Sequence, residues 1–417
     1  MTRNLFSTGR RSVFAALMLG VMGSAVSAET LSMWVRESAA DPGGLMVALW
    51  NSTHEDQIEL TAIPDNQLVT KLATSIRAGD APDLISFDLI YMPDFMKAGF
   101  LADLTDQLAA DPNYANHVQA YKDIATYEDR TYGVGFTPDV SILVWNKDLF
   151  RQAGLDPEVP PQSIYEIHEM ATKIAASGPD TYGFYFAGSC PGCNIFVTSP
   201  LMVAGGATIL PRNADDPALQ GDAIRVVLDQ YRQMWEEGLI PEAAEVDAGE
   251  NFVAAFTNGN VGIAGTGGFL LSLMQRNFPD FDYGVTLLPG LEPGQVSAFV
   301  GGDVVAIPTG GANEAVAREF VSWVLSDEAQ LEGLAKNGIL TTRVDLAENE
   351  YFAGNDKVQT TAAALAAGYV PWVFHFADMV NSDSSPWINM LQRAVFDGEV
   401  DAAIEEARDS MMQIVAE

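Results

Sequence analysis

The chain has 417 residues, of which 56 are acidic and 22 are basic, so its formal net charge is −34 at pH 7. Such a charge argues against binding to nucleic acid or to an anionic membrane surface, and against broad electrostatic capture of anionic ligands. Hydrophobic residues make up 48% of the sequence, which allows sizeable cores and excludes a disordered chain.

The first 28 residues have the pattern of an export signal. Arg3, Arg10 and Arg11 are followed by an apolar stretch over 13–21, and small residues fill 24–28. The apolar stretch is shorter than the roughly 20 residues that a membrane span needs. We expect general secretion into the periplasm, with twin-arginine export as the alternative. No cysteine stands at the expected cleavage point, which favours a freely diffusing form over a lipid-anchored one.

The first part of the mature chain alternates between strand and helix patterns. The expected strands are 30–35, 57–64 and 82–88. The expected helices are 43–55, 66–79 and 92–99. Repeated alternation of this kind predicts a parallel α/β sheet. A chain of this length also exceeds one comfortable core, so two lobes are expected.

The second part continues the alternation with less regular spacing. Strands are expected at 140–145 and 182–188, with strand-like segments over 283–294 and 298–310. Helices are expected at 147–153, 160–177, 222–239 and 313–338, and the tail from 359 onward is mostly helical. Ser163 and Glu166 have capping-box spacing at the start of one helix. The segment 259–275 predicts a strand, a glycine loop and a helix.

Two cysteines, Cys190 and Cys193, lie in the segment GSCPGCN. Export into an oxidising compartment favours a disulfide between them. A thioredoxin-like redox pair is the alternative, but Gly188 and Ser189 precede the pair where an aromatic residue is usual. The residues after it show no clear amphipathic helix either. A local disulfide that tightens a loop is therefore the preferred interpretation.

The sequence gives no positive reason to predict an enzyme, a cofactor or a metal. The four histidines are scattered, and HEMAT at 168–172 lacks the second histidine of a zinc helix. The glycine-rich GTGGF at 265–269 lacks the lysine and the spacing of a nucleotide site. With 56 carboxylates in the chain, an apparent acid and base pair is not evidence for a glycosidase.

Several segments, in their order and spacing, resemble the bacterial extracellular solute-binding proteins of carbohydrate ABC importers, a group that includes the maltose-binding type. The segments are 78–106, with AGDAPDL and GFLADLTD, 132–166, with NKDLFRQAGLDPEVPP, 256–269, 300–330 and 337–345. The chain departs from the pattern at Trp145, where tyrosine is usual, and at Ile164 and Tyr165, where the family has Trp-Asp or similar. The resemblance spans most of the mature chain.

The resemblance implies a two-lobe, periplasmic-binding-protein-like α/β fold with an interlobe cleft and several hinge crossings, near 137–141, 285–290 and 340–346. The N-lobe would comprise 29–138 and 288–341, and the C-lobe 139–287 and 342–417. Such a protein captures a sugar or sugar-like molecule by hinge closure. It then delivers this ligand to membrane ABC permease subunits, and a monomer is expected.

Candidate ligand contacts lie where expected strands end, because ligands of open α/β sheets bind beyond the carboxyl ends of the strands. A sugar needs carboxylates and amides for its hydroxyls and aromatic faces for its C–H surface. Candidates in the first part of the chain are Trp34, Arg36, Glu37, Asp88, Tyr91 and Asp139. Asp139 matches a position where the family often has a ligand-facing carboxylate, although a turn residue at a strand start is the alternative.

Further candidates follow in the second part of the chain. Glycines before a helix let backbone N–H groups approach a ligand, and an arginine fork can hold hydroxyls. The candidates are Asn194, Phe196, Gly267, Gly268, Phe269, Gly302, Asp303, Arg343, Trp372 and Trp387. For each, a turn, a surface ion pair or a core position is the alternative.

The sequence thus predicts a periplasmic sugar-binding receptor. Two alternatives remain: a binding protein for a polyol, a glycerol phosphodiester or a polyamine, and a secreted glycoside hydrolase. The identity of the ligand is not readable from the sequence.

Overall fold

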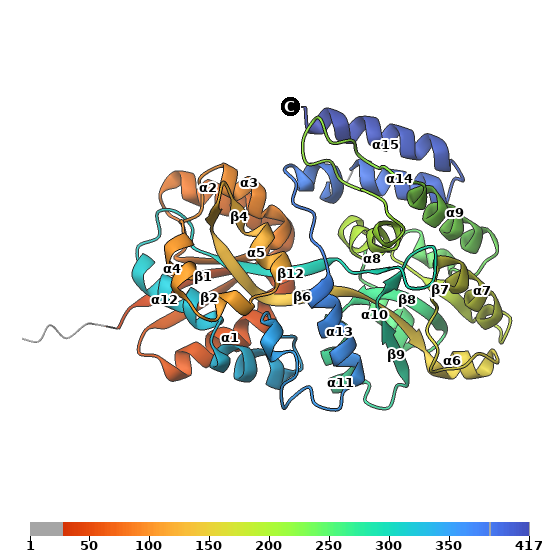
Figure 1. Ribbon diagram of the computed structural model, residues 1–417, viewed down its shortest axis with the longest axis horizontal. Helices are drawn as coiled ribbons and strands as arrows, with labels where there is room; N and C mark the ends of the chain where they lie inside the picture. Colours follow the sequence, from red (N-terminus) through yellow and green to blue (C-terminus); the bar gives the residue numbers. More distant parts are fainter. Residues whose placement is uncertain (1–27, 383–384, 417) are drawn as a thin grey trace, which may run out of the picture.

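The computed structural model describes residues 28–382 and 385–416, so the expected signal, except for its last residue, lies outside the described part. Figure 1 shows two lobes side by side, with β6 and β12 running between them. In the described ranges no helix is both long enough and apolar enough to cross a membrane.

The first lobe is built on a parallel sheet, as the alternating pattern predicts. Strands β1 (Thr30–Arg36), β2 (Gln57–Ile63) and β3 (Leu84–Asp88) pair in parallel, with β1 in the middle. Helices α1 (Ala40–Thr53), α2 (Asp65–Ala78) and α3 (Met92–Lys97) connect or follow them. Gly79 ends α2 in the left-handed conformation that favours glycine. The carboxyl ends of β1, β2 and β3 therefore meet at one edge.

Strand β6 (Gly133–Asn146) joins the two lobes. Its first part, Gly133–Val140, pairs with the antiparallel β12 (Val300–Ala306), which also pairs with β3. Its second part pairs with β8 (Val261–Gly267) and β9 (Tyr283–Thr286), and β8 pairs with β7 (Tyr182–Tyr185). One eight-stranded sheet thus passes through both lobes.

The expected strand 140–145 is too short, because β6 begins at Gly133. Glycines at 133 and 135 and a proline at 138 are typical of a loop, and a proline usually marks a bulge or an edge. Here the β6–β12 pair has a register shift between Asp303 and Val304, next to the partner of Pro138. The absence of side chains at Gly133 and Gly135 leaves room for Val304 and Tyr121. Tertiary contacts therefore extend the strand.

Most other elements lie where the sequence predicts them. The helices of the second lobe and of the crossing segments are α6 (Lys147–Gln152), α7 (Ile164–Ala175), α8 (Pro191–Ala204), α9 (Asp222–Glu236), α10 (Phe252–Thr257), α11 (Phe269–Asn277), α13 (Asp356–Ala367), α14 (Pro386–Val395) and α15 (Val400–Ile414). The predicted cap of α7 is confirmed: the Ser163 hydroxyl accepts the N–H of Glu166, whose carboxylate accepts the N–H of Gln162. Short helices α4 (Thr105–Ala110) and α5 (Gln119–Ile124) complete the first lobe.

Two further predictions of secondary structure are wrong. The helix expected at 313–338 ends early, because α12 (Glu314–Val324) gives way to a π-helical turn at Ala329–Leu334. The strand-like segment 283–294 is broken into β9 and the short β10 (Leu288–Pro289), which pairs with β11 (Val296–Ser297). The residues after the cysteines lack an amphipathic pattern, as the sequence predicts, but they form the helix α8, which is buried on most of its sides.

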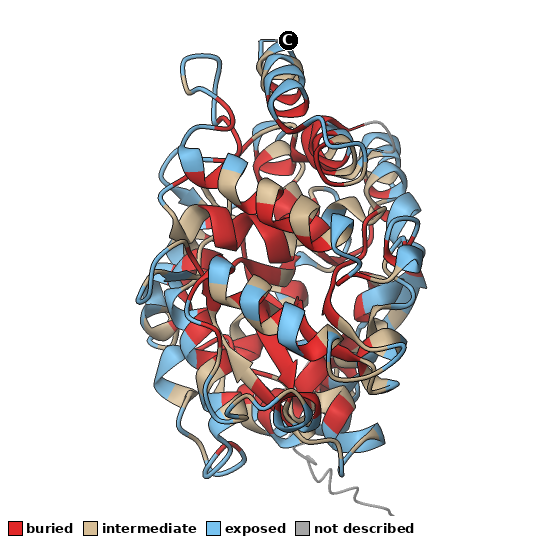
Figure 2. Cartoon of the chain, turned by 90° about the vertical axis from the view of Figure 1, so that its right-hand side faces the viewer, coloured by how far each residue is buried: buried red, intermediate tan, exposed pale blue. Residues whose placement is uncertain are grey.

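The buried residues form one large cluster that continues through both lobes and a smaller one inside the first lobe. In the smaller cluster Trp50 packs edge-on against Phe320 and Trp323, which joins α1 to α12. Figure 2 shows buried residues along the sheet and on the inner sides of the helices around it. This packing holds the strand ends that carry the site.

The chain after α13 returns to the first lobe before it ends in the second. Tyr369 bridges to Phe299, and the Trp372 indole donates to the carbonyl of Thr126 in β4 (Thr126–Tyr127). The backbone N–H of His375 donates to the carboxylate of Asp94 in α3. Helices α14 and α15 then pack against α9. This strap, 369–381, brings a third stretch of chain to the space between the lobes.

Candidate functional site

A cavity of about 530 Å³ lies where the ends of β1, β3 and β12 face β8 and the first turns of α8 and α11. Its size is typical of a small-molecule site. Both lobes and the strap contribute to its lining. The lining residues are Arg36, Asp65, Asn66, Leu68, Val69, Phe87, Asp88, Ile90, Tyr91, Asp139, Phe186, Ala187, Cys190, Gly192, Cys193, Ile195, Phe196, Val197, Gly249, Phe252, Gly265, Thr266, Gly267, Phe269, Phe299, Gly301, Gly302, Phe376 and Asn381.

On the first-lobe side, Arg36 joins two carboxylates into one network. Its Nε donates to Asp303 Oδ1 at 2.6 Å, and its Nη1 donates to Asp88 Oδ2 at 3.1 Å. The Ser86 hydroxyl donates to the other oxygen of Asp303, which is fully buried. The register brings these groups together, because Asp303 of β12 lies opposite Asp88 at the end of β3.

The network pairs opposite charges that are largely buried. Burial raises the pKa of Asp88 and of Asp303, and the guanidinium of Arg36 opposes that shift. Burial disfavours the charged form of Arg36, but the charges of Asp303 and Asp88 raise its pKa above the ordinary value. The guanidinium of Arg36 is therefore already paired with carboxylates of the protein.

Asp139 lies on β6 and faces the first turn of α11. Its Oδ1 accepts the backbone N–H of Val140 at 2.9 Å and that of Phe269 at 3.2 Å. Burial raises the pKa of Asp139 to about 6, although these N–H groups and Arg36 act in the opposite direction. A Cβ on Gly267 would lie 2.5 Å from Asp139 Oδ2, so a larger residue there would displace this carboxylate.

The walls around Asp139 are mostly aromatic. Phe196 packs edge-on against Phe299 with a centroid separation of 5.6 Å, and Phe269 leaves 49% of its surface exposed at the start of α11. Thr266 of β8 is only 4% exposed, and its hydroxyl has no hydrogen-bond partner among the described residues. A ligand in the cavity would meet aromatic faces, the carboxylate of Asp139 and the unsatisfied hydroxyl of Thr266.

The strap closes a third side of the cavity. Phe376 and Asn381 line it, and the Asn381 amide donates to the Tyr91 hydroxyl at 3.3 Å. Burial raises the pKa of Tyr91 above its ordinary value. Tyr91 follows β3 in the first lobe, so this hydrogen bond connects residues that are far apart in sequence across the mouth of the cavity.

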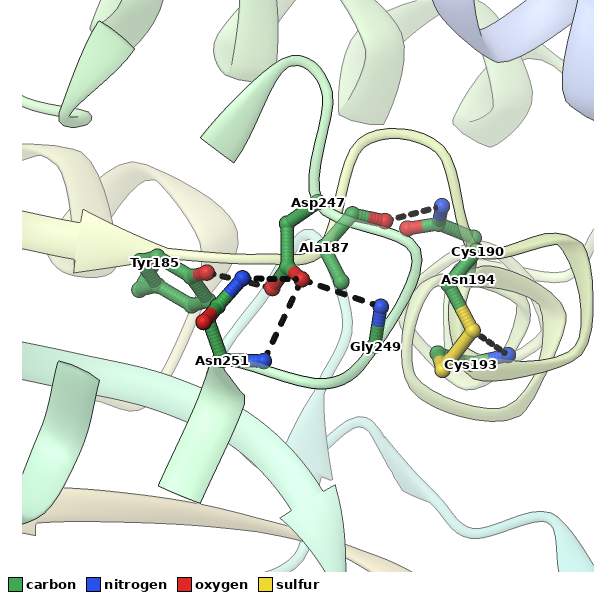
Figure 3. The surroundings of a disulfide bond; sticks show 8 residues. All are labelled: Tyr185, Ala187, Cys190, Cys193, Asn194, Asp247, Gly249 and Asn251. Atoms are coloured by element: carbon green, nitrogen blue, oxygen red, sulfur yellow. Dashed lines mark hydrogen bonds between the residues drawn. A yellow bond between two sulfur atoms is a disulfide. The ribbon is translucent and has the colours of Figure 1, made fainter. Parts of the chain in front are cut away.

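The predicted disulfide between Cys190 and Cys193 is present and forms part of the wall (Figure 3). It closes the first turn of α8, where Cys190 Sγ also accepts the N–H of Cys193. Gly249, at φ 107°, packs on both sulfurs, since a Cβ there would lie 2.8 Å from Cys193 Sγ.

The loop that carries Gly249 is fixed by Asp247. Its carboxylate accepts the Tyr185 hydroxyl and the N–H groups of Gly249 and Asn251 (Figure 3). Asn194 is buried behind this wall and donates to the carbonyl of Ala187 at 2.6 Å. The disulfide and the Asp247 loop together make this side of the cavity rigid.

Half of the residues predicted from the sequence line the cavity: Arg36, Asp88, Tyr91, Asp139, Phe196, Gly267, Phe269 and Gly302. Gly268 and Asp303 lie directly behind this lining, next to Asp139 and Arg36 respectively. Asn194 supports the disulfide wall from behind. These residues lie at strand ends and helix starts and line one cavity; their contact with a ligand stays a prediction.

The remaining predicted residues lie elsewhere. Arg343 is nearly buried and pairs with Asp327 and Asp345. Trp387 is 0% exposed in α14, and Trp372 stacks on Tyr127. Trp34 lies under Lys71, and Glu37 is exposed at the surface outside the cavity lining.

The sequence interpretation missed several lining residues. Asp65 and Asn66 directly follow β2, so the strand-end rule used for Arg36 would have found them. Thr266 directly precedes Gly267 and Gly268, which the sequence predicts as ligand contacts. Phe252, Phe376 and Asn381 carry no comparable local signal, because the packing of distant segments brings them to the cavity.

Comparison with known proteins gives a consistent result. The sequence model of the family described as bacterial extracellular solute-binding protein matches residues 36–331. A protein of Brucella abortus (strain 2308) named as a binding protein is 23% identical over 404 residues, which cover 95% of this chain and 96% of the relative. The diacetylchitobiose binding protein DasA of Streptomyces coelicolor is 22% identical over 352 residues, with 82% and 79% coverage.

Solved structures share the fold. An ABC transporter solute-binding protein from Thermotoga lettingae TMO, bound with alpha-D-tagatose, superposes with a TM-score of 0.80 at 21% identity. The match covers 93% of this chain and 100% of that one. The predicted two-lobe α/β fold of periplasmic binding proteins is confirmed.

Proposed function

The chain belongs to the bacterial extracellular solute-binding protein family, and on that premise we propose that it is a carbohydrate receptor of an ABC importer. The ligand binds in the cavity between the lobes, and closure of the lobes around it produces the form that the permease recognises. Similarity to a protein named for diacetylchitobiose and to a solute-binding protein solved with bound alpha-D-tagatose supports a sugar as the ligand.

The observation that carries this proposal is the composition of the cavity. Aromatic rings such as Phe196 and Phe269 offer flat faces for the C–H surface of a sugar. Carboxylate, amide and hydroxyl groups such as Asp139, Asn381 and Thr266 offer partners for its hydroxyls. These groups come from both lobes and the strap, so a bound ligand contacts all three.

We also propose the lobe boundaries that the sequence predicts, with the N-lobe at 29–138 and 288–341 and the C-lobe at 139–287 and 342–417. The pairing of β6 with β12 before Ser141 and with β8 from Ser141 onward supports a change of lobe near this residue. Rotation about this point would bring Phe269 and Asp139 toward Arg36 and Asp88.

Export and delivery complete the proposal. The basic and apolar pattern of 1–28 supports an N-terminal signal and a mature chain that begins at Glu29 in the periplasm. Membrane permease subunits would be the partners of a monomeric receptor.

The direct test is a ligand screen on the purified mature chain. Monosaccharides, disaccharides, trisaccharides and polyols are added one at a time, and the melting temperature is measured. We expect one of these classes to raise it, with a stoichiometry near one by calorimetry. A screen in which no carbohydrate or polyol shifts the transition would overturn the assignment.

A matched pair of variants then tests the location of the site. Phe269→Ala removes an aromatic ring that is 49% exposed in the cavity, and Tyr165→Ala removes one that is 46% exposed on α7. We expect Phe269→Ala to lower the affinity for the sugar identified in the screen about tenfold or more. Tyr165→Ala should leave this affinity unchanged. Equal effects would place the ligand elsewhere.

The receptor is proposed to bind its ligand without turnover. Incubation of the sugar with stoichiometric protein, followed by denaturation and mass spectrometry, should return the sugar intact. Accumulation of cleaved sugar beyond one equivalent would favour the alternative of a secreted glycoside hydrolase.

A further inference from the structure

The charged groups of the cavity are unevenly balanced. Among the described residues, the charged side chains in its lining are Arg36, Asp65, Asp88 and Asp139. Arg36 is already bonded to Asp88 and to Asp303 behind it. Asp65 accepts the hydroxyl and the N–H of Ser38. Within the described ranges, the lining thus carries more carboxylates than cations, and its one cation, Arg36, is already paired.

Among the described residues, two of the lining carboxylates, Asp65 and Asp139, form no ion pair. Asp65 is already bonded to Ser38, which leaves Asp139. In the described part of the chain, its hydrogen-bond donors are backbone N–H groups, and those of Val140 and Phe269 bond to Oδ1. No lysine, arginine or histidine forms an ion pair with it within the described ranges. Its Oδ2 lies beside Gly267, which itself lines the cavity. This oxygen is available to a ligand.

Closure of the lobes makes the charge imbalance more costly. When water leaves the cavity, a carboxylate loses its solvation, and a neutral hydroxyl replaces only part of it. An ammonium group supplies both hydrogen bonds and an opposite charge. The nearby rings of Phe196, Phe269 and Phe299 present faces to which a cation is attracted. The unsatisfied hydroxyl of Thr266 can accept a further N–H.

We propose that the ligand is an amino sugar, whose protonated amine binds Asp139 while its ring and hydroxyls occupy the aromatic and polar walls. This inference rests on the proposed carbohydrate function and narrows it to a cationic class. The same charge balance excludes uronic acids and sugar phosphates, because Arg36 is not free to pair with them.

The test compares an amine-bearing sugar with counterparts that carry a hydroxyl or an N-acetyl group in place of the amine, and with an acidic sugar. Calorimetry at pH 6.5 measures the binding of each sugar to the wild-type mature chain. The monosaccharides are glucosamine, glucose, N-acetylglucosamine and glucuronic acid. The disaccharides are those of glucosamine, glucose and N-acetylglucosamine with the same β-1,4 linkage. We expect an amine-bearing sugar to bind at least tenfold more tightly than its hydroxyl and N-acetyl counterparts, and the acid not to bind. This comparison needs no variant.

Asp139→Asn keeps the shape and the Oδ1 acceptor but removes the charge. We expect it to lower the affinity for the amine by at least tenfold and to change that for the neutral counterpart by less than threefold. Asp280→Asn, which removes an exposed carboxylate outside the cavity, is the control for net charge and should change neither. An unchanged preference for the amine in Asp139→Asn would overturn the role of Asp139.

The outcomes also separate this inference from the proposed function. A neutral sugar that binds as tightly as its amine counterpart overturns the inference and leaves the carbohydrate receptor intact. Putrescine and spermidine form a further arm. If they bind and every sugar fails, both the carbohydrate function and the amino-sugar inference are overturned.

Discussion

On one side of the cavity, at the ends of β1, β3 and β12, the charges of Arg36, Asp88 and Asp303 form a single paired network. On the other side, at β6, β8 and α11, Asp139 and Thr266 face the cavity with only backbone donors or no partner. The first side is complete without a ligand, whereas the second keeps acceptors free. The difference supports the proposal that the first side fixes the shape of the site and that the second side selects the ligand.

The largest expected effect comes from breaking the paired side. Arg36→Met leaves the fully buried Asp303 and the partly buried Asp88 without a cation, so we expect a loss of about 3–5 kcal/mol in the free energy of unfolding. Urea denaturation measures it. Arg130→Met, which removes an exposed pair with Asp103 at 3.7 Å, is the control and should cost less than about 1 kcal/mol.

A second substitution checks the cause. If unpaired charge is responsible, Asp303→Asn in the Arg36→Met background should restore part of the lost stability. Equal losses for the Arg36 and Arg130 variants would mean that the network is not a structural element.

On the side of the cavity that carries Asp139, we expect removal of the charge to increase the stability of the ligand-free protein. The pKa of Asp139 is raised from 3.8 to about 6 in the folded protein, so the folded state holds this proton more tightly than the unfolded state. Stability attributable to Asp139 is therefore highest at low pH and falls as pH rises from about 4 to 6. At pH 7 the ionised carboxylate destabilises the ligand-free protein.

Asp139→Asn removes that penalty. We expect the ligand-free variant to gain about 3 kcal/mol relative to wild type at pH 7, and the gain to shrink toward zero near pH 4. Melting temperatures across this range measure it, with Asp280→Asn as the control. A gain that is the same at both pH values would contradict the assignment.

The disulfide wall should have a moderate effect. Cys190 and Cys193 are three positions apart, and closure of so short a loop is worth about 2 kcal/mol. We expect the Cys190→Ser, Cys193→Ser double variant to lose about this much stability. It should also bind ligand more weakly, because Phe196 and Val197 of α8 line the cavity.

Reducing agent provides the matched comparison. It should shift the melting temperature of wild type toward that of the double variant and leave the variant unchanged. A double variant as stable as wild type would show that the Asp247 loop alone holds this wall.

The smallest effect is expected at Arg343, which pairs with carboxylates as Arg36 does but lies outside the cavity. Its partners Asp327 and Asp345 are partly exposed, so Arg343→Met should cost about 1–2 kcal/mol. The affinity of the Arg343→Met variant for the ligand should equal that of the wild type. A large loss of affinity without a loss of stability would return Arg343 to the list of ligand contacts.

Local sequence signals determined much of this protein. The strand and helix alternation over 30–99, the capping box at Ser163 and the glycine stop at Gly79 each follow from backbone preferences of a few neighbouring residues. The rule that ligands bind at strand ends predicted a site at Arg36, Asp88, Tyr91 and Asp139, and all four line the cavity. The rule applies because the ends of parallel strands meet at one edge in any such sheet.

Only the tertiary structure decided the rest of the site. Arg343 and Trp387 look like ligand contacts by residue type, but packing buries them in an ion-pair cluster and in α14. Phe376 and Asn381 have no local signal and reach the cavity because the strap returns across the first lobe. Residue type and spacing set local conformation, whereas the partners of a side chain depend on which distant segments pack beside it.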